Sequence, residues 1–426
     1  MKISATVDMF DDGGRSIPQW LRNLARKAVL SKLQNLEHGV IVLHEAKEAL
    51  SFGQLSEECA LTAHIQVHDA SMYLRILLNG SIGAGEGYML GLWSSRQLTE
   101  LLRIFVVNRT ALLGMEKGVS HIGVFILRLW HLARRNTKVG SRKNIQSHYD
   151  IGNEFYSLFL DTEKMYSSAV YPSTNSELEA AARFKLEMIC DKLDLQPSDH
   201  LLEIGTGWGG LAIYAAKHYG CKVTTTTISK EQFEYARRRI AEEGVEKKVT
   251  LLMKDYRELA GQYDKLVSVE MIEAVGHQYY PTFFEKCSQL LTANGLALIQ
   301  SITIKDQYYE RAKKSVDFIQ RYIFPGGGLP AVYVIMNQIT KNTDMRLLHQ
   351  FDFAEDYAKT LNEWRARFFD QLEQVRLLGY SERFIRMWEY YLCYCEAGFL
   401  ERSIGVSQFV FAKPKNRQKT IMECSS

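Results

Sequence analysis

Apolar and polar positions follow two different patterns along the chain. From about residue 148 to residue 305, short apolar runs typical of strands alternate with segments of helical spacing. The apolar runs lie at His200–Ile204, Lys222–Thr227, Val249–Met253, Lys265–Val269 and Leu296–Ile302, and helical segments at 177–193 and 230–243 lie between them. This alternation predicts an α/β fold in which helices cover both faces of a doubly wound, mostly parallel sheet. Beyond residue 306 the pattern is mainly helical and aromatic-rich, with a single late strand at Gln408–Ala412.

The N-terminal part has a different pattern. Residues 17–36 have apolar positions three and four apart and include the basic residues Arg22, Arg26, Lys27 and Lys32. This predicts a helix that either packs on its own domain or lies on an anionic membrane surface. The next segments indicate strands at Val40–Leu43, Thr62–Val67 and Met72–Leu78, a glycine-rich loop from Gly80 to Gly91, and a helix at 96–115. We therefore expect a smaller α+β accessory domain at residues 1–120, with membrane or dimer contacts.

Residues 121–143 form the expected boundary between the two parts. An apolar stretch from Ile122 to Trp130 overlaps a basic cluster of Arg128, Arg134, Arg135, Lys138, Arg142 and Lys143. Such a cluster could contact phospholipid headgroups, and a solvated basic linker is an equal alternative. The pattern then predicts a catalytic domain at 144–415 and a tail at 416–426.

Composition excludes several classes of protein. The 426 residues carry a net charge of only +3, so bulk charge indicates no nucleic-acid partner. Seven cysteines without a Cys-x-x-Cys pair argue against a metal site or a disulfide framework and for a reducing compartment. The first residues lack the apolar core of a signal peptide, and no apolar run approaches the ~20 residues of a membrane span. We expect a cytoplasmic protein that associates with membranes peripherally.

The most informative motif is a glycine-rich turn that follows the first predicted strand. Residues 203–210 read Glu-Ile-Gly-Thr-Gly-Trp-Gly-Gly, and a helix-like segment follows. Glycine allows a tight turn and a close approach of a ligand, and the next helix N-terminus can hold a carboxylate. The spacing fits the first motif of the class I S-adenosylmethionine (SAM) methyltransferases. We therefore expect Glu203, Gly205, Gly207, Gly209 and Gly210 to contact SAM.

Polar residues also follow the second and third predicted strands. Thr227 and Gln232 follow one, and the sequence Asp255-Tyr256-Arg257 follows the other. Ligands of doubly wound sheets bind at the carboxyl ends of the strands, so these residues belong to the same expected cofactor site.

Several motifs resemble the cyclopropane fatty acid synthase family. They are Met271-Ile-Glu-Ala-Val-Gly276, His148-Tyr-Asp-Ile-Gly-Asn153, Met165-Tyr-Ser-Ser-Ala169, Tyr322-Ile-Phe-Pro-Gly-Gly327, Tyr357-x-x-Thr-Leu-x-x-Trp364 and Trp388-x-Tyr-Tyr391. The resemblance covers residues 144–413, and it is weaker in the N-terminal part, at Gly83-x-Gly-Glu-Gly-Tyr-Met. It implies a Rossmann-like methyltransferase sheet with helical additions that bind an acyl chain, and it places Tyr166 and Ser167 among the SAM contacts.

The resemblance also implies a reaction and a site. In that family the π bond of a cis-unsaturated acyl chain attacks the methyl group of SAM, and the resulting cation loses a proton and closes to a cyclopropane. A bicarbonate ion serves as the base, and its ligands carried over to this chain are Ser168, Glu273, Gln300, the backbone of Ile302, and Tyr357. The expected substrates are unsaturated membrane phospholipids, and the expected assembly is a homodimer.

Three positions depart from the common bacterial pattern. Gln300 replaces a His, although plant-type members resemble this chain there, and its amide can still donate to an anion. Ser168 replaces a Cys, and Glu270 stands where many bacterial members have Gly and plant-type members have an acid. The general base is therefore the element that the resemblance specifies least.

These departures leave other functions open. A sister enzyme would methylate the same double bond without closing a ring, giving a methyl-branched or methylene product. A methyltransferase for a soluble amphipathic molecule and a non-catalytic lipid- or SAM-binding protein are further alternatives.

Overall fold

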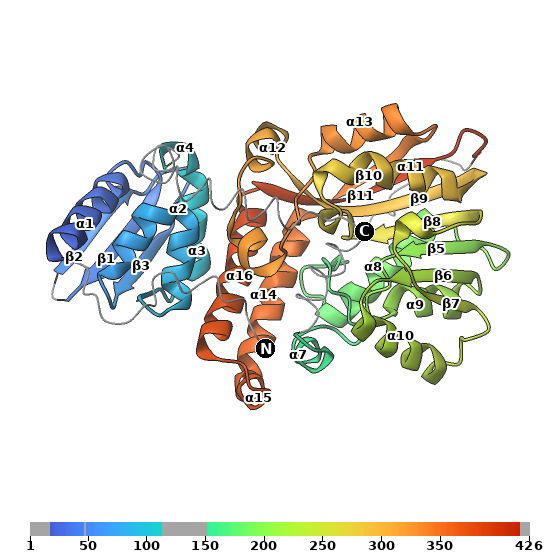
Figure 1. The fold of residues 1–426 in the computed structure, drawn as a ribbon, viewed down its shortest axis with the longest axis horizontal. Helices are drawn as coiled ribbons and strands as arrows, with labels where there is room; N and C mark the ends of the chain where they lie inside the picture. Colours follow the sequence, from blue (N-terminus) through green and yellow to red (C-terminus); the bar gives the residue numbers. More distant parts are fainter. Residues whose placement is uncertain (1–17, 47, 113–150, 418–426) are drawn as a thin grey trace. The chain divides into compact units, whose positions relative to one another are not determined.

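The chain divides into two compact units, residues 1–123 and residues 124–426. The computed structural model describes residues 18–46, 48–112 and 151–417. The basic linker predicted at 121–143, His148 and most of the predicted tail lie outside these described residues. Each unit is built around its own sheet (Figure 1).

The N-terminal unit combines a four-stranded sheet with helices. Its elements are α1 (Gln19–Leu33), β1 (Gly39–Glu45), β2 (Glu48–Gln54), β3 (Thr62–Val67), α2 (Ser71–Met89), β4 (Trp93–Ser94), α3 (Leu98–Val107) and α4 (Arg109–Leu112). The strand order is β2-β1-β3-β4, in which β1 pairs antiparallel with β2 and parallel with β3. The predicted helix at 17–36 and the strands at Val40–Leu43 and Thr62–Val67 are confirmed.

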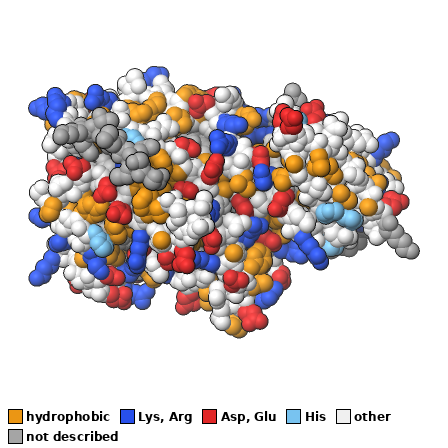
Figure 2. Space-filling model, turned by 180° about the vertical axis from the view of Figure 1, so that it is seen from behind, with side chains coloured by type: hydrophobic (Ala, Val, Ile, Leu, Met, Phe, Trp, Pro, Cys, Tyr) orange, Lys and Arg blue, Asp and Glu red, His pale blue; other side chains and the backbone are white. Residues whose placement is uncertain are grey.

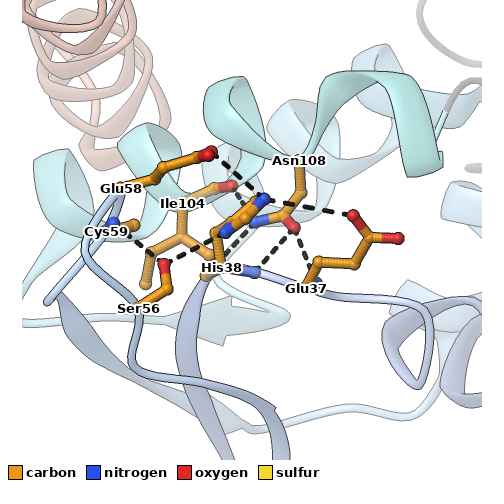
Figure 3. Close-up of polar contacts among 7 residues, drawn as sticks. All are labelled: Glu37, His38, Ser56, Glu58, Cys59, Ile104 and Asn108. Atoms are coloured by element: carbon orange, nitrogen blue, oxygen red, sulfur yellow. Dashed lines mark hydrogen bonds and ion pairs between the residues drawn. The ribbon is translucent and has the colours of Figure 1, made fainter.

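A buried asparagine ties the end of α3 to the start of the sheet (Figure 3). The side-chain oxygen of Asn108 accepts from the backbone N–H groups of Glu37 (2.8 Å) and His38 (3.1 Å). Its amide nitrogen donates to the carbonyls of His38 (2.6 Å) and Ile104 (2.8 Å). Because one buried side chain satisfies all these backbone groups, the cluster has a structural role: it holds the end of α3 against the segment before β1.

The strand predicted at Met72–Leu78 and the loop predicted from Gly80 are wrong. Both lie in α2, which is kinked at Gly80, where φ is 57°. The glycines after the kink serve packing rather than turns. A Cβ on Gly83 would lie 2.0 Å from the carbonyl oxygen of Arg75, and one on Gly87 would lie 3.1 Å from the ring of Trp93. The apolar run was thus one stretch of a buried helix, which periodicity alone does not distinguish from a strand.

The larger unit contains a seven-stranded sheet of the predicted doubly wound type. Its strands are β5 (His200–Ile204), β6 (Lys222–Thr227), β7 (Val249–Met253), β8 (Tyr263–Val269), β9 (Leu291–Ile304), β10 (Arg346–Asp352) and β11 (Ile404–Ala412). The order is β10-β11-β9-β8-β5-β6-β7, with β5 to β9 parallel and β10 and β11 antiparallel. The five parallel strands predicted from the sequence and the late strand at Gln408–Ala412 are confirmed.

Helices cover both faces of this sheet (Figure 1). Side chains of α8 (Leu178–Lys192), α9 (Gly210–His218) and α10 (Lys230–Glu242) form one core with the strands. Side chains of α11 (Tyr280–Leu290) and α13 (Val332–Asn342) form the core on the other face. The two cores explain why the parallel strands read as continuous apolar runs, since they are buried on both sides.

The remaining helices extend the sheet domain beyond the usual αβ repeat. They are α7 (Asn153–Ser157), α12 (Asp306–Ala312), α14 (Ala354–Asp370), α15 (Leu372–Leu377) and α16 (Glu382–Leu400), with single-turn helices at Tyr256–Glu258, Ile272–Ala274 and His277–Tyr279 and a π-helical turn at Ile319–Ile323. Strand β10 was missed because most of its residues are partly or fully exposed at the sheet edge, so no apolar alternation marks it.

Candidate active site

The glycine turn between β5 and α9 has a backbone that only glycine adopts readily. Gly205, Gly207 and Gly209 have φ angles of 108°, 54° and 89°. Gly210 is needed for a different reason, because a Cβ there would lie 2.6 Å from the carbonyl oxygen of Glu163. The turn leads into the N-terminus of α9, where free N–H groups and the helix dipole favour a carboxylate. These features fit the carboxylate end of a SAM molecule.

Glu203 lies beneath this turn rather than in it. Its side chain is buried and accepts a hydrogen bond from the hydroxyl of Thr225 (2.5 Å), which in turn is bonded to the hydroxyl of Thr206 (2.6 Å). Burial raises the pKa of Glu203 to about 8. The structure therefore gives Glu203 a position that supports the glycine turn through two threonines.

The raised pKa of Glu203 predicts a pH-dependent effect of the Glu203→Gln substitution. When the pKa of a carboxyl group is higher in the folded state than in the unfolded state, the group contributes its full stability below the unfolded pKa. This contribution is lost as the pH rises from there through the folded pKa. Glutamine keeps the hydrogen bond without ionising. We expect the stability of the variant relative to wild type to increase by on the order of 4 kcal/mol between pH 4.5 and pH 8. Urea unfolding at several pH values measures it, and a difference independent of pH would contradict this assignment.

The residues after β6 form a small hydrogen-bonded group at the start of α10. The hydroxyl of Thr227 donates to the side-chain oxygen of Gln232 (2.9 Å) and accepts from the backbone N–H of Ser229 (3.1 Å). The Ser229 hydroxyl caps α10 by accepting from the Gln232 backbone N–H (3.3 Å). Thr227 and Gln232 are thus held together at the carboxyl end of a parallel strand, where ligands of this fold bind.

The residues after β7 carry an internal ion pair. Asp255 accepts from the backbone N–H of Arg257 (3.0 Å) and is paired with its guanidinium (2.7 Å). The intervening Tyr256 packs its ring edge-to-face on Phe283. The Asp255 carboxylate is therefore fixed in orientation by the residue two positions later.

A buried carboxylate forms the centre of the predicted anion site. Glu270 follows β8 and accepts three hydrogen bonds: from the backbone N–H of Ser168 (2.9 Å), the amide of Gln300 (2.8 Å) and the hydroxyl of Tyr357 (2.7 Å). The Ser168 hydroxyl instead donates to the carbonyl of Ala169 (2.9 Å). Three of the five residues expected to hold bicarbonate therefore meet at the side chain of Glu270.

Glu273, the fourth of these residues, lies next to the fifth. One carboxylate oxygen accepts from the backbone N–H of Ile302 (2.5 Å) and the hydroxyl of Ser301 (3.1 Å). The other oxygen is buried and has no hydrogen-bond partner among the described residues. Burial and, after it, the charge of Glu270 raise the pKa of Glu273 to about 8. Glu273 therefore holds a proton at neutral pH. Burial also raises the pKa of Glu270, but Lys185 and the three donors around Glu270 oppose this rise by stabilising its ionised form.

Lys185 supplies a buried positive charge to the site. Its ammonium group donates to the hydroxyl of Ser167 (2.6 Å) and attracts the carboxylates of Glu270 and Asp161. Burial lowers the pKa of Lys185 to about 8, so it remains mostly protonated at pH 7. Sequence reasoning missed this residue, although a signal existed: Lys185 shares the buried face of α8 with Leu178, Ala181, Ala182 and Ile189.

The orientation of the Gln300 amide is fixed from behind. Its side-chain oxygen accepts from the amide of Gln408 (3.1 Å), whose own oxygen accepts from the ammonium group of Lys192 (3.0 Å). Because Lys192 can only donate, it sets the direction of both amides, and the Gln300 nitrogen must then face Glu270. This chain of contacts explains how a glutamine acts here as a defined donor.

Aromatic side chains pack around Tyr357, which donates to Glu270. The Tyr357 ring stacks on Phe399 with centroids 4.4 Å apart, and the Tyr166 ring lies 5.4 Å from that of Trp364. The Tyr166 hydroxyl is bonded to that of Tyr391 (3.0 Å). Such faces attract a cation and keep water away from it.

The glycine turn and the carboxylates adjoin one another. A Cβ on Gly205 would lie 3.4 Å from the side chain of Met271, which is the neighbour of Glu270 in the chain. On the far side, the indole N–H of Trp208 donates to the side chain of Asn153 (2.6 Å), the last residue of the predicted His148–Asn153 motif. The structure thus combines a SAM-type turn with a buried, aromatic-lined acid site.

Comparison with known proteins identifies the family. The model of the mycolic acid cyclopropane synthetase family matches residues 136–409. The chain belongs to this family. This member is 37% identical over 347 residues to the tuberculostearic acid methyltransferase UfaA1 of Mycobacterium tuberculosis, covering 80% of each chain. It is 36% identical over 371 residues to the cyclopropane-fatty-acyl-phospholipid synthase of Escherichia coli K12, covering 86% of this chain and 92% of that one.

Solved structures agree with the family assignment. The mycolic acid cyclopropane synthase CmaA1 in complex with SAH and CTAB is 30% identical and superposes with a TM-score of 0.60 over 64% of this chain and 98% of that one. The cyclopropane synthase MmaA2 of M. tuberculosis gives the same TM-score at 28% identity. This family member is a SAM-dependent methyltransferase, and the predicted fold class is confirmed.

Two kinds of feature are absent from the described residues. In residues 18–46, 48–112 and 151–417, no helix is long and apolar enough to span a bilayer. The same ranges hold no group of three His, Cys, Asp or Glu side chains arranged for a metal ion.

Proposed function

We propose that this enzyme transfers a one-carbon unit from SAM to the cis double bond of an unsaturated phospholipid acyl chain and closes a cyclopropane ring. The observation that carries the proposal is the ionisable Glu270 carboxylate, buried among aromatic rings beside the glycine turn. A base in a dry pocket next to the methyl donor is what ring closure requires. The similarity to the E. coli phospholipid synthase supports the choice of substrate.

The first half of the site would hold SAM, which supplies an electrophilic methyl group. The turn from Gly205 to Gly210 and the N-terminus of α9 would receive its carboxylate. Thr227 and Gln232 would face the ribose, and Asp255 would face the adenine amino group, since both positions lie at carboxyl ends of parallel strands. Tyr166 and Ser167 would close the site from the segment that precedes α8.

The second half of the site would handle the acyl chain. The π electrons of the double bond form a new bond to the methyl carbon as the carbon–sulfur bond breaks, leaving a positive charge on the neighbouring acyl carbon. The rings of Tyr357, Tyr166 and Trp364 would stabilise this charge. Loss of a proton from the delivered carbon then releases the electron pair that closes the ring.

A second candidate is carbon transfer without ring closure. The name of UfaA1, a tuberculostearic acid methyltransferase at 37% identity, favours it. If a hydride moves to the cationic carbon before the proton is lost, the same base produces an exocyclic methylene group. Both products contain one more carbon and two more hydrogens than the substrate, so mass alone does not separate them.

Expression in a bacterium that lacks its own synthase tests the proposal. We expect the extracted fatty acids to include chains one CH₂ heavier than the monounsaturated precursors, resistant to mild hydrogenation. Products that take up hydrogen would establish the methylene alternative, and unchanged lipids would contradict both. Gas chromatography with mass spectrometry of the methyl esters makes the measurement, and cells with an empty vector are the control.

Contact with the membrane would follow from a phospholipid substrate. Helix α1 exposes Trp20 and Leu24, which are 67% and 54% accessible, together with Lys27. An exposed apolar pair beside a cation is typical of helices at membrane interfaces. The face of the protein in Figure 2 mixes basic and acidic side chains, so attraction to anionic lipid would be local. Fractionation of the same cells tests this contact, because the protein should sediment with their membranes. The predicted homodimer is a separate expectation, which light scattering of the purified protein can test.

A further inference from the structure

The donors predicted to bind a bicarbonate ion are already used by the protein's own carboxylates. Ser168, Gln300 and Tyr357 donate to Glu270, and the backbone N–H of Ile302 donates to Glu273. A bicarbonate ion at this place would have to displace the Glu270 side chain. The described residues therefore do not fit a bound bicarbonate.

The charges of the site lead to the same conclusion. The carboxylates of Glu270 and Asp161 already attract the buried cation Lys185. A bicarbonate would add another negative charge to a site in which the ionisable groups of Glu270 and Lys185 are buried. Burying an uncompensated ion costs several kcal/mol, so the anion would bind weakly.

The backbone of Glu270 is held in an unusual conformation. Its φ is 47°, in the left-handed region that costs a non-glycine residue about 1–3 kcal/mol. Its N–H donates to the carbonyl of Gln300 (2.8 Å), which places the residue at the end of β8 against β9. The strained backbone directs the carboxylate toward the three donors. Strain of this kind is concentrated at functional sites.

We propose that the Glu270 carboxylate is the general base of this enzyme and takes the place of bicarbonate. This inference rests on the proposed carbon transfer and specifies its proton acceptor. Oε1 of Glu270 accepts from Ser168 and Gln300, whereas Oε2 accepts only from Tyr357 among the described residues. Since each carboxylate oxygen can accept two hydrogen bonds, Oε2 has room for the proton.

The proton step balances without a co-reactant. Oε2 takes a proton from the delivered carbon, and the electrons of that carbon–hydrogen bond form the second carbon–carbon bond of the ring. The cation disappears, and Glu270 becomes a neutral carboxylic acid. After the product leaves, the acid returns its proton to solvent, which restores the carboxylate for the next turnover.

Bicarbonate dependence of the full-length enzyme tests the proposal. The substrates are vesicles of cis-monounsaturated phosphatidylglycerol and labelled SAM, in CO₂-free buffer with or without added bicarbonate. We expect the wild-type rate to be unaffected by bicarbonate. Glu270→Gln, which is isosteric but cannot accept the proton, should lower the rate at least ~100-fold with no rescue. Glu270→Gly relieves the backbone strain and leaves the three donors free. Added bicarbonate should therefore raise the rate of this variant at least ~10-fold.

A binding measurement accompanies the rates. Bicarbonate should raise the melting temperature of Glu270→Gly and not that of wild type, since only the variant has free donors. Glu243→Gln, a matched change at a surface ion pair, should leave the rate within about twofold. Retained binding of S-adenosylhomocysteine verifies that each variant is folded.

Different results overturn different claims. A wild-type rate that rises ~10-fold with bicarbonate, or a Glu270→Gln variant at the wild-type rate, overturns the assignment of the base while carbon transfer stands. If wild type transfers no carbon to any lipid, the proposed function fails. The melting temperatures still decide on the anion site in that case, because a wild type stabilised by bicarbonate contradicts the inference.

Discussion

Replacing Lys185 by methionine is expected to lower the rate of carbon transfer at pH 7, by up to the ~100-fold that a lost general base costs, with recovery at higher pH. Burial raises the pKa of Glu270, and the buried cation Lys185 opposes this rise. Without it, the pKa of Glu270 rises further, so a smaller fraction of the carboxylate is ionised at neutral pH. Because a base must be ionised to act, the acidic limb of the pH–rate profile should move to higher pH. Rates measured from pH 6 to pH 10 determine the shift.

Lys192→Met is the matched comparison for this variant. Lys192 lies two turns later on α8, is also buried, and is linked to Glu270 through Gln408 and Gln300. We expect it to lower the rate less and to leave the shape of the pH profile unchanged. Equal pH shifts in both variants, or an unshifted profile for Lys185→Met, would show that Lys185 does not control the charge of Glu270.

Replacing Gly210 by alanine is expected to destabilise the enzyme and weaken SAM binding. The new Cβ would lie 2.6 Å from the carbonyl oxygen of Glu163 and 2.9 Å from the sulfur of Met165. The Glu163 carbonyl is held by the guanidinium of Arg239 (3.0 Å), so the segment moves only at a cost. Overpacking of this kind costs about 1–3 kcal/mol. The displaced segment continues into Tyr166 and Ser168. The affinity for SAM should therefore also fall, by at least ~10-fold if binding must overcome the same strain energy.

Gly244→Ala separates the steric effect from that of the backbone. Gly244 has a φ of 67°, and an added Cβ there meets no atom within 4 Å. We expect a loss of about 1 kcal/mol from the left-handed conformation and no change in SAM affinity. Denaturant unfolding and calorimetric titration of SAM measure both variants. If the two variants had the same stability and the same SAM affinity, the steric clash at Gly210 would not be the cause of weaker SAM binding.

The glycine turn was predictable because its signal is local. A five-residue apolar strand, four glycines within six residues and a following helix are adjacent in the chain, and their backbone angles follow from the absence of Cβ atoms. The parallel strands were predictable for a similar reason, since burial on both faces leaves continuous apolar runs. Strand β10 and helix α2 lacked such signals. The first depends on pairing at the sheet edge, and the second contains glycines that serve close packing.

The surroundings of Glu270 were not predictable in the same way. Its hydrogen-bond partners lie 102, 30 and 87 positions away, at Ser168, Gln300 and Tyr357. The resemblance to the cyclopropane fatty acid synthases selected these three donors but assigned them to a bicarbonate ion. Only the structure places the Glu270 carboxylate among them, because a side chain's direction at the end of a strand depends on its neighbours.

The sequence by itself determined the α/β sheet, the class of the cofactor and the chemical types of residue in the site. These follow from periodicity and from glycine geometry, which act over a few residues. The tertiary structure decided which carboxylate accepts the donors, which lysine balances its charge and how Gln300 is oriented. Those properties arise where β8, β9, α8 and α14 meet, because the pKa and direction of a buried polar group depend on charges and donors that the chain brings from distant positions.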